Sequence, residues 1–288
     1  MHNIKTKGEK AFDVFNYIFF AVLSLIMIYP VWHQLCLSFS DANLAKTGGF
    51  FFWPRGFTLT GYSIVLSSRY IWVAFLNSAI ITVSAVVLSV LFCSAFAYLL
   101  SKRHAPGSRI LMMLVLFSFL FTGGMIPTYM VVKDTGLLNS LWALIIPVLF
   151  APYNIIILKN FMSSLPLSLE ESALIDGAGY FTIFFKMVLP LSKPALATIS
   201  IWVAVSQWNG YMNALLYIQD KSKYILPLLV RDIVIGASDM ANIEVSAMTN
   251  ADVINAVTIV IATVPILIVY PFLQKYFTKG IMLGAVKG

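Results

Sequence analysis

The sequence predicts an all-α membrane protein with six transmembrane helices, on the evidence of its composition and of where its charges fall. Of the 288 residues, 60% are hydrophobic and 11% are charged, whereas a soluble domain is about 45–50% apolar and about 25% charged. Each charge-free run reaches the roughly 20 residues that a helix needs to cross the hydrocarbon core. The runs lack barrel-type alternation, so α-helices must satisfy the backbone in lipid. Asp, Glu, Lys and Arg are absent from residues 14–40, 70–101, 110–132, 135–158, 194–219 and 253–274.

The first run predicts a retained helix rather than a cleaved signal peptide. It is longer than the usual apolar core of a signal, and no small-x-small cleavage pattern follows it. Leu35 precedes Cys36, where a lipoprotein cysteine needs a small residue. Cys36 and Cys93 both lie inside apolar runs, where a lone cysteine behaves as a small hydrophobe.

Lysine and arginine are distributed unevenly between the two sides of the predicted helices. One side, with both termini and residues 101–109 and 159–193, carries 12 of the 19 basic residues, and the other carries 7. The positive-inside rule therefore predicts that both termini are cytoplasmic. Membrane topology accounts for the basic net charge, so no nucleic-acid partner is predicted.

Two predicted outer segments are long enough to contact another protein. Residues 41–69 contain the aromatic run Phe50 to Trp53, which could bind a partner or form a belt at the headgroups. Residues 220–250 carry charges of both signs. The outer loop at 133–139 permits only a tight link.

The segment from Ser168 to Pro190 is predicted to form two short helices joined by a glycine turn. Ser168 and Glu171 have the S-x-x-E spacing of a capping box, so a helix should begin there. Gly177 should end it, because glycine closes a helix at low steric cost. Such a unit could cover helix ends or fit a groove on another protein. The second helix should stop at Pro190 and present an apolar face made of Phe181, Phe184, Phe185 and Val188.

Polar residues in the fifth run are predicted to line a solute path or to bond helix five to its neighbours. Amides offer donors and acceptors, and aromatic rings offer flat apolar faces, which is the mix that a sugar requires. Gly123 and Gly124 predict an irregular stretch in the third run. The uncharged runs argue against a proton relay and favour an uncharged solute. The polar set comprises Trp202, Ser206, Asn209 and Asn213 at helical spacing, with Gln207, Trp208 and Tyr211 beside them.

The sequence predicts no catalytic residue, metal site or cofactor within this chain. It contains no G-x-x-x-x-G-K-[ST] loop for a nucleotide. His2, His33 and His104 lie at unrelated depths, without metal-ligand spacing.

The segment 168–190 resembles the EAA loop of ABC importer permeases. The family pattern is E-A-A, three residues, G, nine residues, I, one residue, L-P. This chain has Glu171-Ser172-Ala173, Gly177, Met187 and Leu189-Pro190 at those positions, with Ser172 and Met187 departing from the pattern. In that family the loop is the coupling helix that docks into the ATPase. The resemblance implies coupling roles for Glu170, Glu171, Ala173, Asp176, Gly177, Met187, Leu189 and Pro190.

Further motifs are similar to maltose-type permeases of the G-subunit kind. They are Met125-Ile126-Pro127, Gly136-Leu137-Leu138-Asn139, Trp208-Asn209 with Tyr211, and Leu226-Pro227-Leu228. Asp176-Gly177-Ala178 is similar to the sugar-importing branch, and Gly123-Gly124 resembles permeases for complex oligosaccharides.

The resemblance implies a type I ABC importer permease in a bacterial cell membrane. Residues 1–288 would form one permease domain, with cytoplasmic tails at 1–13 and 275–288 and the coupling loop at 159–193. The implied partners are a second permease in a heterodimer, two ATP-binding subunits that hold ATP and Mg, and an extracellular or periplasmic solute-binding protein that delivers a sugar. Ser206, Trp208, Asn209, Tyr211, Asn213, Gly123 and Gly124 are the predicted solute path.

Three alternatives stay open at this point. An ion-gradient-driven transporter would need midplane charges and inverted repeats with interrupted helices, and the sequence shows neither clearly. An ABC importer for a non-sugar solute would share the coupling loop. A membrane anchor would not need a polar face on helix five.

Overall fold

The computed structural model describes residues 6–45, 49–102, 105–235 and 251–285, with side chains as far as residue 268. Within these ranges the chain is helical, and the extended pairing is one isolated bridge between Ser40 and Phe57. Three helices are long and apolar enough to cross a membrane alone, and three bent helix pairs qualify together. The predicted all-α fold is confirmed, with six spans if each bent pair counts as one.

Contacts divide the chain into two compact units, and the first combines the N-terminal segment with a segment from late in the sequence. Unit 1 comprises Met1–Arg69 and Val230–Val264. It holds α1 (Lys7–Ser38), α2 (Ala42–Ala45), α3 (Thr60–Ser67) and the first part of α15 (Ala251–Ala285). The predicted single permease domain, with its tails, stays a prediction.

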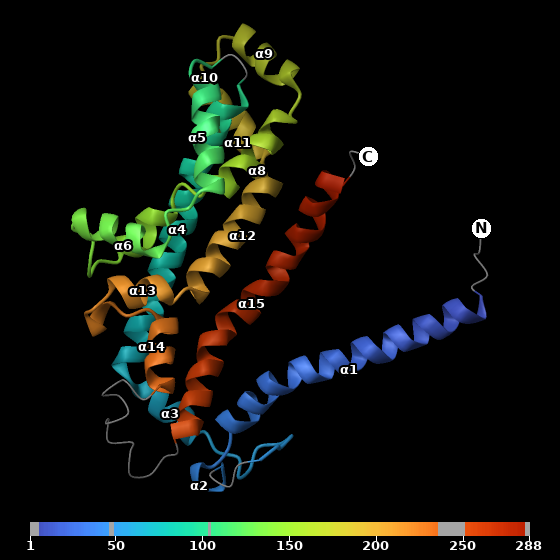
Figure 1. Ribbon diagram of the computed structural model, residues 1–288, viewed down its shortest axis with the longest axis vertical. Helices are drawn as coiled ribbons and strands as arrows, with labels where there is room; N and C mark the ends of the chain where they lie inside the picture. Colours follow the sequence, from blue (N-terminus) through green and yellow to red (C-terminus); the bar gives the residue numbers. More distant parts are fainter. Residues whose placement is uncertain (1–5, 46–48, 103–104, 236–250, 286–288) are drawn as a thin grey trace. The chain divides into compact units, whose positions relative to one another are not determined.

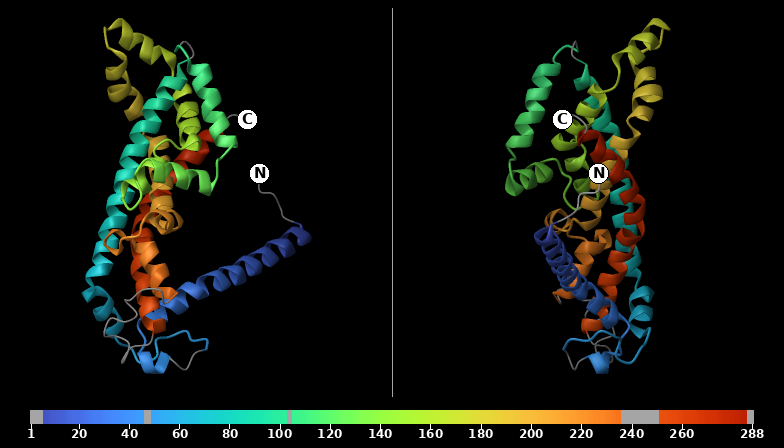
Figure 2. Two further views of the ribbon diagram at one scale, coloured as in Figure 1. Left: turned by 60° about the vertical axis from the view of Figure 1, so that its left-hand side comes forward. Right: turned by 90° about the vertical axis from the view of Figure 1, so that its right-hand side faces the viewer.

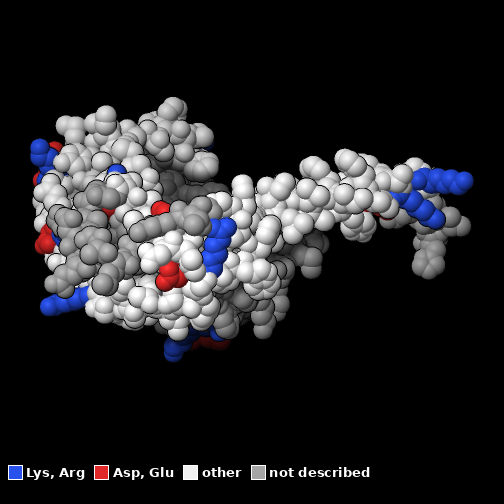
Figure 3. Space-filling model, turned by 90° about the horizontal axis from the view of Figure 1, so that it is seen from below, with Lys and Arg blue, Asp and Glu red and all other residues white. Residues whose placement is uncertain are grey.

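The helix α1 carries a capping box that the sequence analysis did not identify. The Thr6 hydroxyl accepts from the Glu9 N–H, and the Glu9 carboxylate accepts from the Thr6 N–H. Beyond its first turns α1 is almost wholly apolar and exposed, and charged atoms lie only near its beginning (Figure 3). Lipid or another protein must cover such a surface.

The aromatic run of the first outer segment packs back onto α1. The Trp32 indole N–H donates to the Phe52 carbonyl at 2.8 Å, and the Phe51 ring lies 4.6 Å from the His33 ring. Phe51 is buried, whereas Phe50 and Trp53 are exposed. Part of this run is therefore packing within unit 1.

Unit 2 comprises Tyr70–Leu229 and Pro265–Gly288 and holds the elements on which both predicted sites lie (Figure 1). It is built along α4 (Arg69–Ser101), and α14 (Leu226–Val234) starts in it. The intervening elements are α5 (Ser108–Leu120), α6 (Met125–Asp134), α7 (Trp142–Ile145), η1 (Ile146–Val148), α8 (Pro152–Ser163), α9 (Leu167–Ile175), α10 (Tyr180–Ile183), η2 (Phe184–Val188), α11 (Leu189–Leu191), α12 (Lys193–Asn209), α13 (Met212–Tyr217) and η3 (Lys221–Lys223).

Three of the predicted spans are bent pairs of helices rather than straight rods. The break between α5 and α6 is 119°, that between η1 and α8 is 45°, and that between α11 and α12 is 77°. The sharpest bend lies at the predicted irregular stretch, where Gly124 has φ +83° (Figure 2). The predicted irregular stretch is confirmed, and the other two breaks were not predicted.

Two apolar clusters form the core of unit 2, and α4 contributes to both. One cluster lies toward α9, and we call that end of unit 2 the α9 end. The other lies toward the α6–α7 linker, and we call it the Asn139 end. The first cluster includes Cys93, Ala97, Leu158, Ile183, Phe184 and Ile199, and the second includes Ile81, Val132, Leu144, Tyr217 and Leu228.

Candidate functional site

The predicted coupling segment begins one residue earlier than its sequence indicated. The helix α9 starts at Leu167, directly after Pro166, and no side chain caps it. Ser168 already lies in the first turn, so its hydroxyl is not in the N-cap position. Instead its carbonyl accepts from the Ser172 hydroxyl at 2.8 Å. The predicted Ser168–Glu171 capping box is therefore wrong.

The end of α9 is the glycine turn that the sequence predicts. Gly177 has φ +81°, a conformation that costs a residue with a Cβ roughly 1–2 kcal/mol. The Gly177 N–H donates to the Leu174 carbonyl, and the Ala178 N–H donates to the Ala173 carbonyl. These two bonds make a Schellman motif. No atom lies within 4 Å of a Cβ built on Gly177, so backbone conformation, not space, requires glycine here.

Glu170 faces its own chain rather than solvent. Its carboxylate forms an ion pair with the Lys102 ammonium and accepts from the Tyr98 hydroxyl at 3.4 Å. The Lys102 ammonium also lies 4.5 Å from the centre of the Tyr98 ring, and that ring lies 5.2 Å from Phe184. Burial lowers the pKa of Lys102, which the carboxylate opposes by stabilising the charged ammonium. The ion pair therefore joins α9 to the end of α4.

The segment from α9 to η2 exposes a group of apolar side chains. Ile175 is 86% exposed and Phe181 is 83% exposed. The exposed carboxylates of Glu171 and Asp176 lie on the same segment. We call the apolar group the coupling patch, and it consists of Leu167, Ile175, Tyr180, Phe181 and Phe185.

The predicted apolar face of the second short helix is wrong in its register. Phe184 and Val188 are buried, but Phe181 and Phe185 are exposed. The buried edge consists of Ile183, Phe184 and Val188, so the side of the segment that packs on the cluster at the α9 end is turned away from Phe181 and Phe185.

The second short helix continues one residue past Pro190. Pro190 lies within α11, and the Leu189 N–H donates five residues back to the Phe184 carbonyl. The helix then ends at Leu191, and the axis bends by 77° before α12, so the stop lies one residue beyond the predicted position. Met187 and Leu189 pack against the buried cluster at the α9 end.

The predicted polar face of helix five is interrupted. The helix α12 ends at Asn209, and α13 begins at Met212. At Gly210 a Cβ would lie 3.0 Å from the Ser206 carbonyl oxygen, so glycine permits this close turn. Ser206 and Asn209 lie on α12, whereas Asn213 lies on α13, and the prediction of one continuous face is wrong.

The residues of the predicted solute path differ in what they contact. The Asn209 amide donates to the Val205 carbonyl at 2.9 Å, and the Trp208 ring packs edge-on against Phe75 at 5.7 Å. The Gln207 amide donates to the Leu144 carbonyl at 2.8 Å, so Gln207 bonds α12 to α7. The exposed members of the set are Ser206, Asn209, Tyr211, Asn213, Gly123 and Gly124.

Sequence reasoning gave no site role to Lys102, Tyr98 and Asn77, and included Asn139 only in a family motif. Asn77 and Tyr98 are polar groups inside an uncharged membrane run, where a polar side chain usually has a partner. Among the described residues, no group of three or more His, Cys, Asp or Glu side chains could hold a metal ion.

This chain is similar to transport proteins along nearly its whole length. It is 44% identical to the polygalacturonan/rhamnogalacturonan transport system permease protein YtcP of Bacillus subtilis (strain 168), covering 97% of this chain and 99% of that one. It is 45% identical to Protein LplC of the same organism, covering 100% and 98%.

A solved structure shares its fold. That structure is a bacterial ABC transporter involved in the import of the acidic polysaccharide alginate, and its matched chain is 30% identical, with a TM-score of 0.90. The match covers 96% of this chain and 99% of that one. With several apolar helices and these relatives, the chain is a multi-pass membrane protein and a transport subunit.

The family model described as "Binding-protein-dependent transport system inner membrane component" matches residues 4–283, and this chain belongs to that family of ABC transporter permeases.

Proposed function

We propose that this chain is one of two permease subunits of an ATP-driven importer for oligosaccharides, with acidic oligosaccharides as the preferred class. YtcP is named for polygalacturonan and rhamnogalacturonan, and the matched structure for alginate, an acidic polysaccharide. An acidic solute does not need a charged path, because Asn amides and hydroxyls donate to carboxylates. The earlier preference for an uncharged solute rested only on the uncharged spans.

The observation that carries the coupling role is the coupling patch. Exposed rings and aliphatic side chains on two short helices fit a groove on another protein. The Schellman turn at Gly177 and the Lys102–Glu170 pair hold these helices in one geometry. We therefore assign Glu171, Asp176 and the coupling patch to docking on an ATPase that binds ATP and Mg, and Glu170 to positioning.

The α9 end is proposed to face the cytoplasm. The Lys102–Glu170 contact places the 101–109 turn and the 159–193 segment at the same end of unit 2. Both segments were assigned to the positive side by charge. The α6–α7 linker and the residues after α13 would then face the solute-binding protein.

Transport would follow from two states of the permease with different affinity for the ATPase. Closure of the ATP-bound subunits would shift the α9 end, and unit 2 would expose its solute path to the other side. The ATPase can shift the equilibrium between the two permease states only as far as its difference in affinity for them allows. A rigid coupling segment is required because a flexible one would bind the ATPase equally well in both states. Ser206, Asn209, Tyr211 and Asn213 are proposed to contact the solute together with the second permease.

Affinity purification from native membranes tests the assembly. The tagged chain should co-purify with a P-loop ATPase and a second permease. After reconstitution into liposomes, the complex should take up oligogalacturonides in an ATP-dependent manner. Recovery of the chain alone, with gradient-driven uptake, would establish the secondary-transporter alternative instead. ATP-dependent uptake of only a non-sugar solute would retain the coupling role and reject the substrate class.

Two substitutions test the docking residues in that assembly. Glu171→Lys and Gly177→Asp should release the ATPase or uncouple its hydrolysis from uptake, without loss of membrane insertion. The matched control is Asp134→Lys, which makes the same charge change as Glu171→Lys at an exposed carboxylate of α6. Asp134→Lys should retain the ATPase. Wild-type uptake in both docking variants would falsify the coupling assignment.

A further inference from the structure

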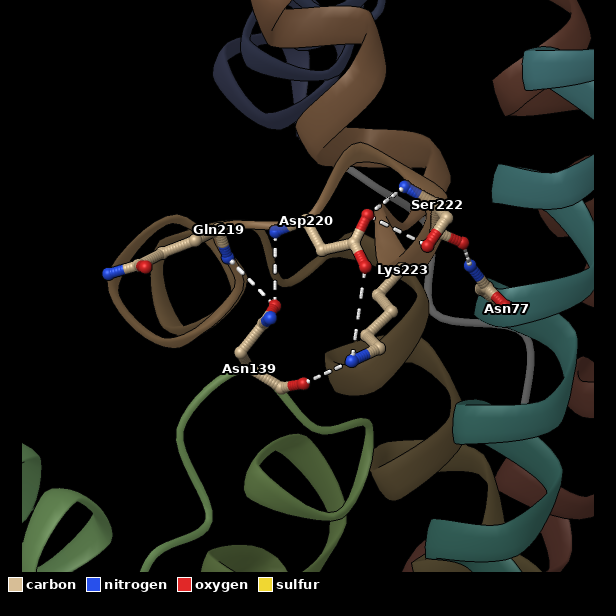
Figure 4. Close-up of polar contacts among 6 residues, drawn as sticks. All are labelled: Asn77, Asn139, Gln219, Asp220, Ser222 and Lys223. Carbon is tan, nitrogen blue, oxygen red and sulfur yellow. Dashed lines mark hydrogen bonds and ion pairs between the residues drawn. The ribbon is translucent and has the colours of Figure 1, made fainter.

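Asn139 binds the loop that follows α13 through both its side chain and its backbone (Figure 4). Its side-chain oxygen accepts from the N–H groups of Gln219 at 3.3 Å and Asp220 at 3.0 Å. Its own N–H donates to the Tyr217 carbonyl at 2.7 Å. Its carbonyl accepts from the Lys223 ammonium at 2.7 Å. One residue of the α6–α7 linker thus makes four bonds to residues about 80 positions later.

The conformation of Asn139 explains why asparagine suits this position. Its φ is +56°, and within the described ranges it is the one non-glycine residue with positive φ. Asparagine tolerates the left-handed region better than most side chains do. Glycine would also adopt that conformation, but it has no side-chain acceptor for the two N–H groups.

The same loop is attached to α4 by a second amide. The Asn77 side chain donates to the carbonyls of Ser222 at 3.0 Å and Tyr224 at 2.9 Å. Within the loop, the Asp220 carboxylate accepts from the Ser222 N–H at 2.9 Å and hydroxyl at 2.8 Å. We call this set, Asn77, Asn139, Gln219, Asp220, Ser222 and Lys223, the Asn139 hub.

The hub joins segments from three spans. The α6–α7 linker follows the most sharply bent span, the loop after α13 ends the fifth, and Asn77 belongs to the second. Leu137 and Leu138, just before Asn139, pack on the apolar cluster that contains Tyr217 and Ile218. The hydrogen bonds of the hub and the packing of the apolar cluster therefore both hold α6 and α13 against α4.

We propose that Asn139 is a positioning residue for transport, which keeps α6 and α13 in one rigid body at the end of unit 2 opposite the coupling segment. The inference rests on the proposed import function. The Gln219 and Asp220 N–H groups are near solvent, so water can replace the lost acceptor and the fold survives. What is lost is the fixed relation between α6 and α13, which carries Asn213 of the proposed solute path.

Three variants separate the contributions of the Asn139 backbone conformation, the Asn139 side-chain acceptor and the Lys223 ammonium. Asn139→Gly keeps the left-handed backbone and removes the side-chain acceptor, and Asn139→Asp keeps an acceptor oxygen. Lys223→Met removes the ammonium, with its bond to the Asn139 carbonyl and its ion pair with Asp220. In the purified full complex, spin labels are attached at Met130→Cys on α6 and Met212→Cys on α13, both exposed positions. The natural Cys36 and Cys93 are buried, and the unsubstituted chain measures their background labelling.

The rigid-body role predicts one narrow label distance in the wild-type chain, unchanged between nucleotide-free and ATP–vanadate-trapped complexes. Asn139→Gly should broaden it and lower the maximal rate of oligogalacturonide uptake about tenfold, the effect of losing two hydrogen bonds of about 0.7 kcal/mol each. Half-saturation, basal ATPase activity and ATPase co-purification should stay the same. Asn139→Asp should stay within about twofold of wild type, and Lys223→Met should lie between the two.

The proposal is overturned if Asn139→Gly keeps both the narrow distance and wild-type uptake, or if the distance broadens while uptake is unchanged. A wild-type distance that changes on trapping would also overturn it. If no ATPase co-purifies with any variant, the import function fails, whereas the label distances in the isolated chain still report on the rigid link.

Discussion

The two ends of unit 2 are held by different chemistry. At the α9 end, one ion pair between Lys102 and Glu170 lies against the Tyr98 ring, and the coupling patch is exposed on the same segment of chain. At the Asn139 end, side-chain amides bind backbone groups, and the charges are exposed. The first end therefore exposes apolar side chains, whereas the second exposes charged and polar ones.

This difference predicts which substitutions each end tolerates. A partly buried ion pair is costly to break, because removing one member leaves the other charge poorly solvated. An exposed hydrogen bond contributes only about 0.5–1.5 kcal/mol, because water replaces it. Charge changes should therefore damage the α9 end most, whereas the Asn139 end should respond strongly only where a backbone group is buried.

The largest effect is expected for reversing the charge of Lys102. In the native pair the Lys102 side chain is 23% exposed and the Glu170 side chain is 14% exposed. Lys102→Glu would therefore place two carboxylates in contact at a largely buried position. We expect the free energy of unfolding to fall by up to about 3–5 kcal/mol, together with loss of bound ATPase. Thermal unfolding in detergent and co-purification measure the two effects.

The matched control is the double exchange Lys102→Glu with Glu170→Lys. It restores opposite charges at the same positions, so it should recover most of the stability that each single variant loses. A double variant no better than the singles would show that the pair does not join α9 to α4.

A smaller effect is expected where a fully buried backbone N–H of the Asn139 end donates to a side chain of α4. The Leu226 N–H, at a fully buried residue, donates to the Ser78 hydroxyl at 2.7 Å. Ser78→Ala leaves that N–H without its acceptor and should cost about 1–3 kcal/mol. The control is Ser94→Ala, because the buried Ser94 hydroxyl bonds only the Leu91 carbonyl of its own helix. Equal melting temperatures for the two variants would contradict the prediction.

How much the sequence could predict follows the same division. The charge-free runs and the Gly177 turn depend on residues next to one another, and both are confirmed. The start of α9 was misplaced because Pro166 and Ser168 offer competing signals within three residues. The irregular stretch at Gly124 was predicted from its two adjacent glycines, whereas the break at Gly210 was missed because the polar residues on both sides of it keep helical spacing.

The contacts that fix the two ends could not be predicted from spacing. Lys102 meets Glu170 and Asn139 meets Asp220 across 68 and 81 positions of sequence. These pairs form only once distant segments pack together along α4, and the sequence does not show which segments become neighbours. The resemblance identified Glu170 and Asn139 as members of motifs, but not that both side chains face inward to their own chain.

The smallest expected effect is the pH dependence of Asp220. Hydrogen bonds from the Ser222 N–H and hydroxyl, with the nearby Lys223 ammonium, hold the pKa of Asp220 below its ordinary value. A carboxylate with a lowered pKa stabilises the fold above its unfolded pKa of about 3.9, and this stabilisation is lost as the pH falls through the folded value. Asp220→Asn should therefore melt slightly below wild type from pH 8 to 5, and the gap should close below about pH 4. The gap stays small because the group is exposed. A gap that changes between pH 6 and 8 would require another titrating group, and the Asn139 hub contains no histidine.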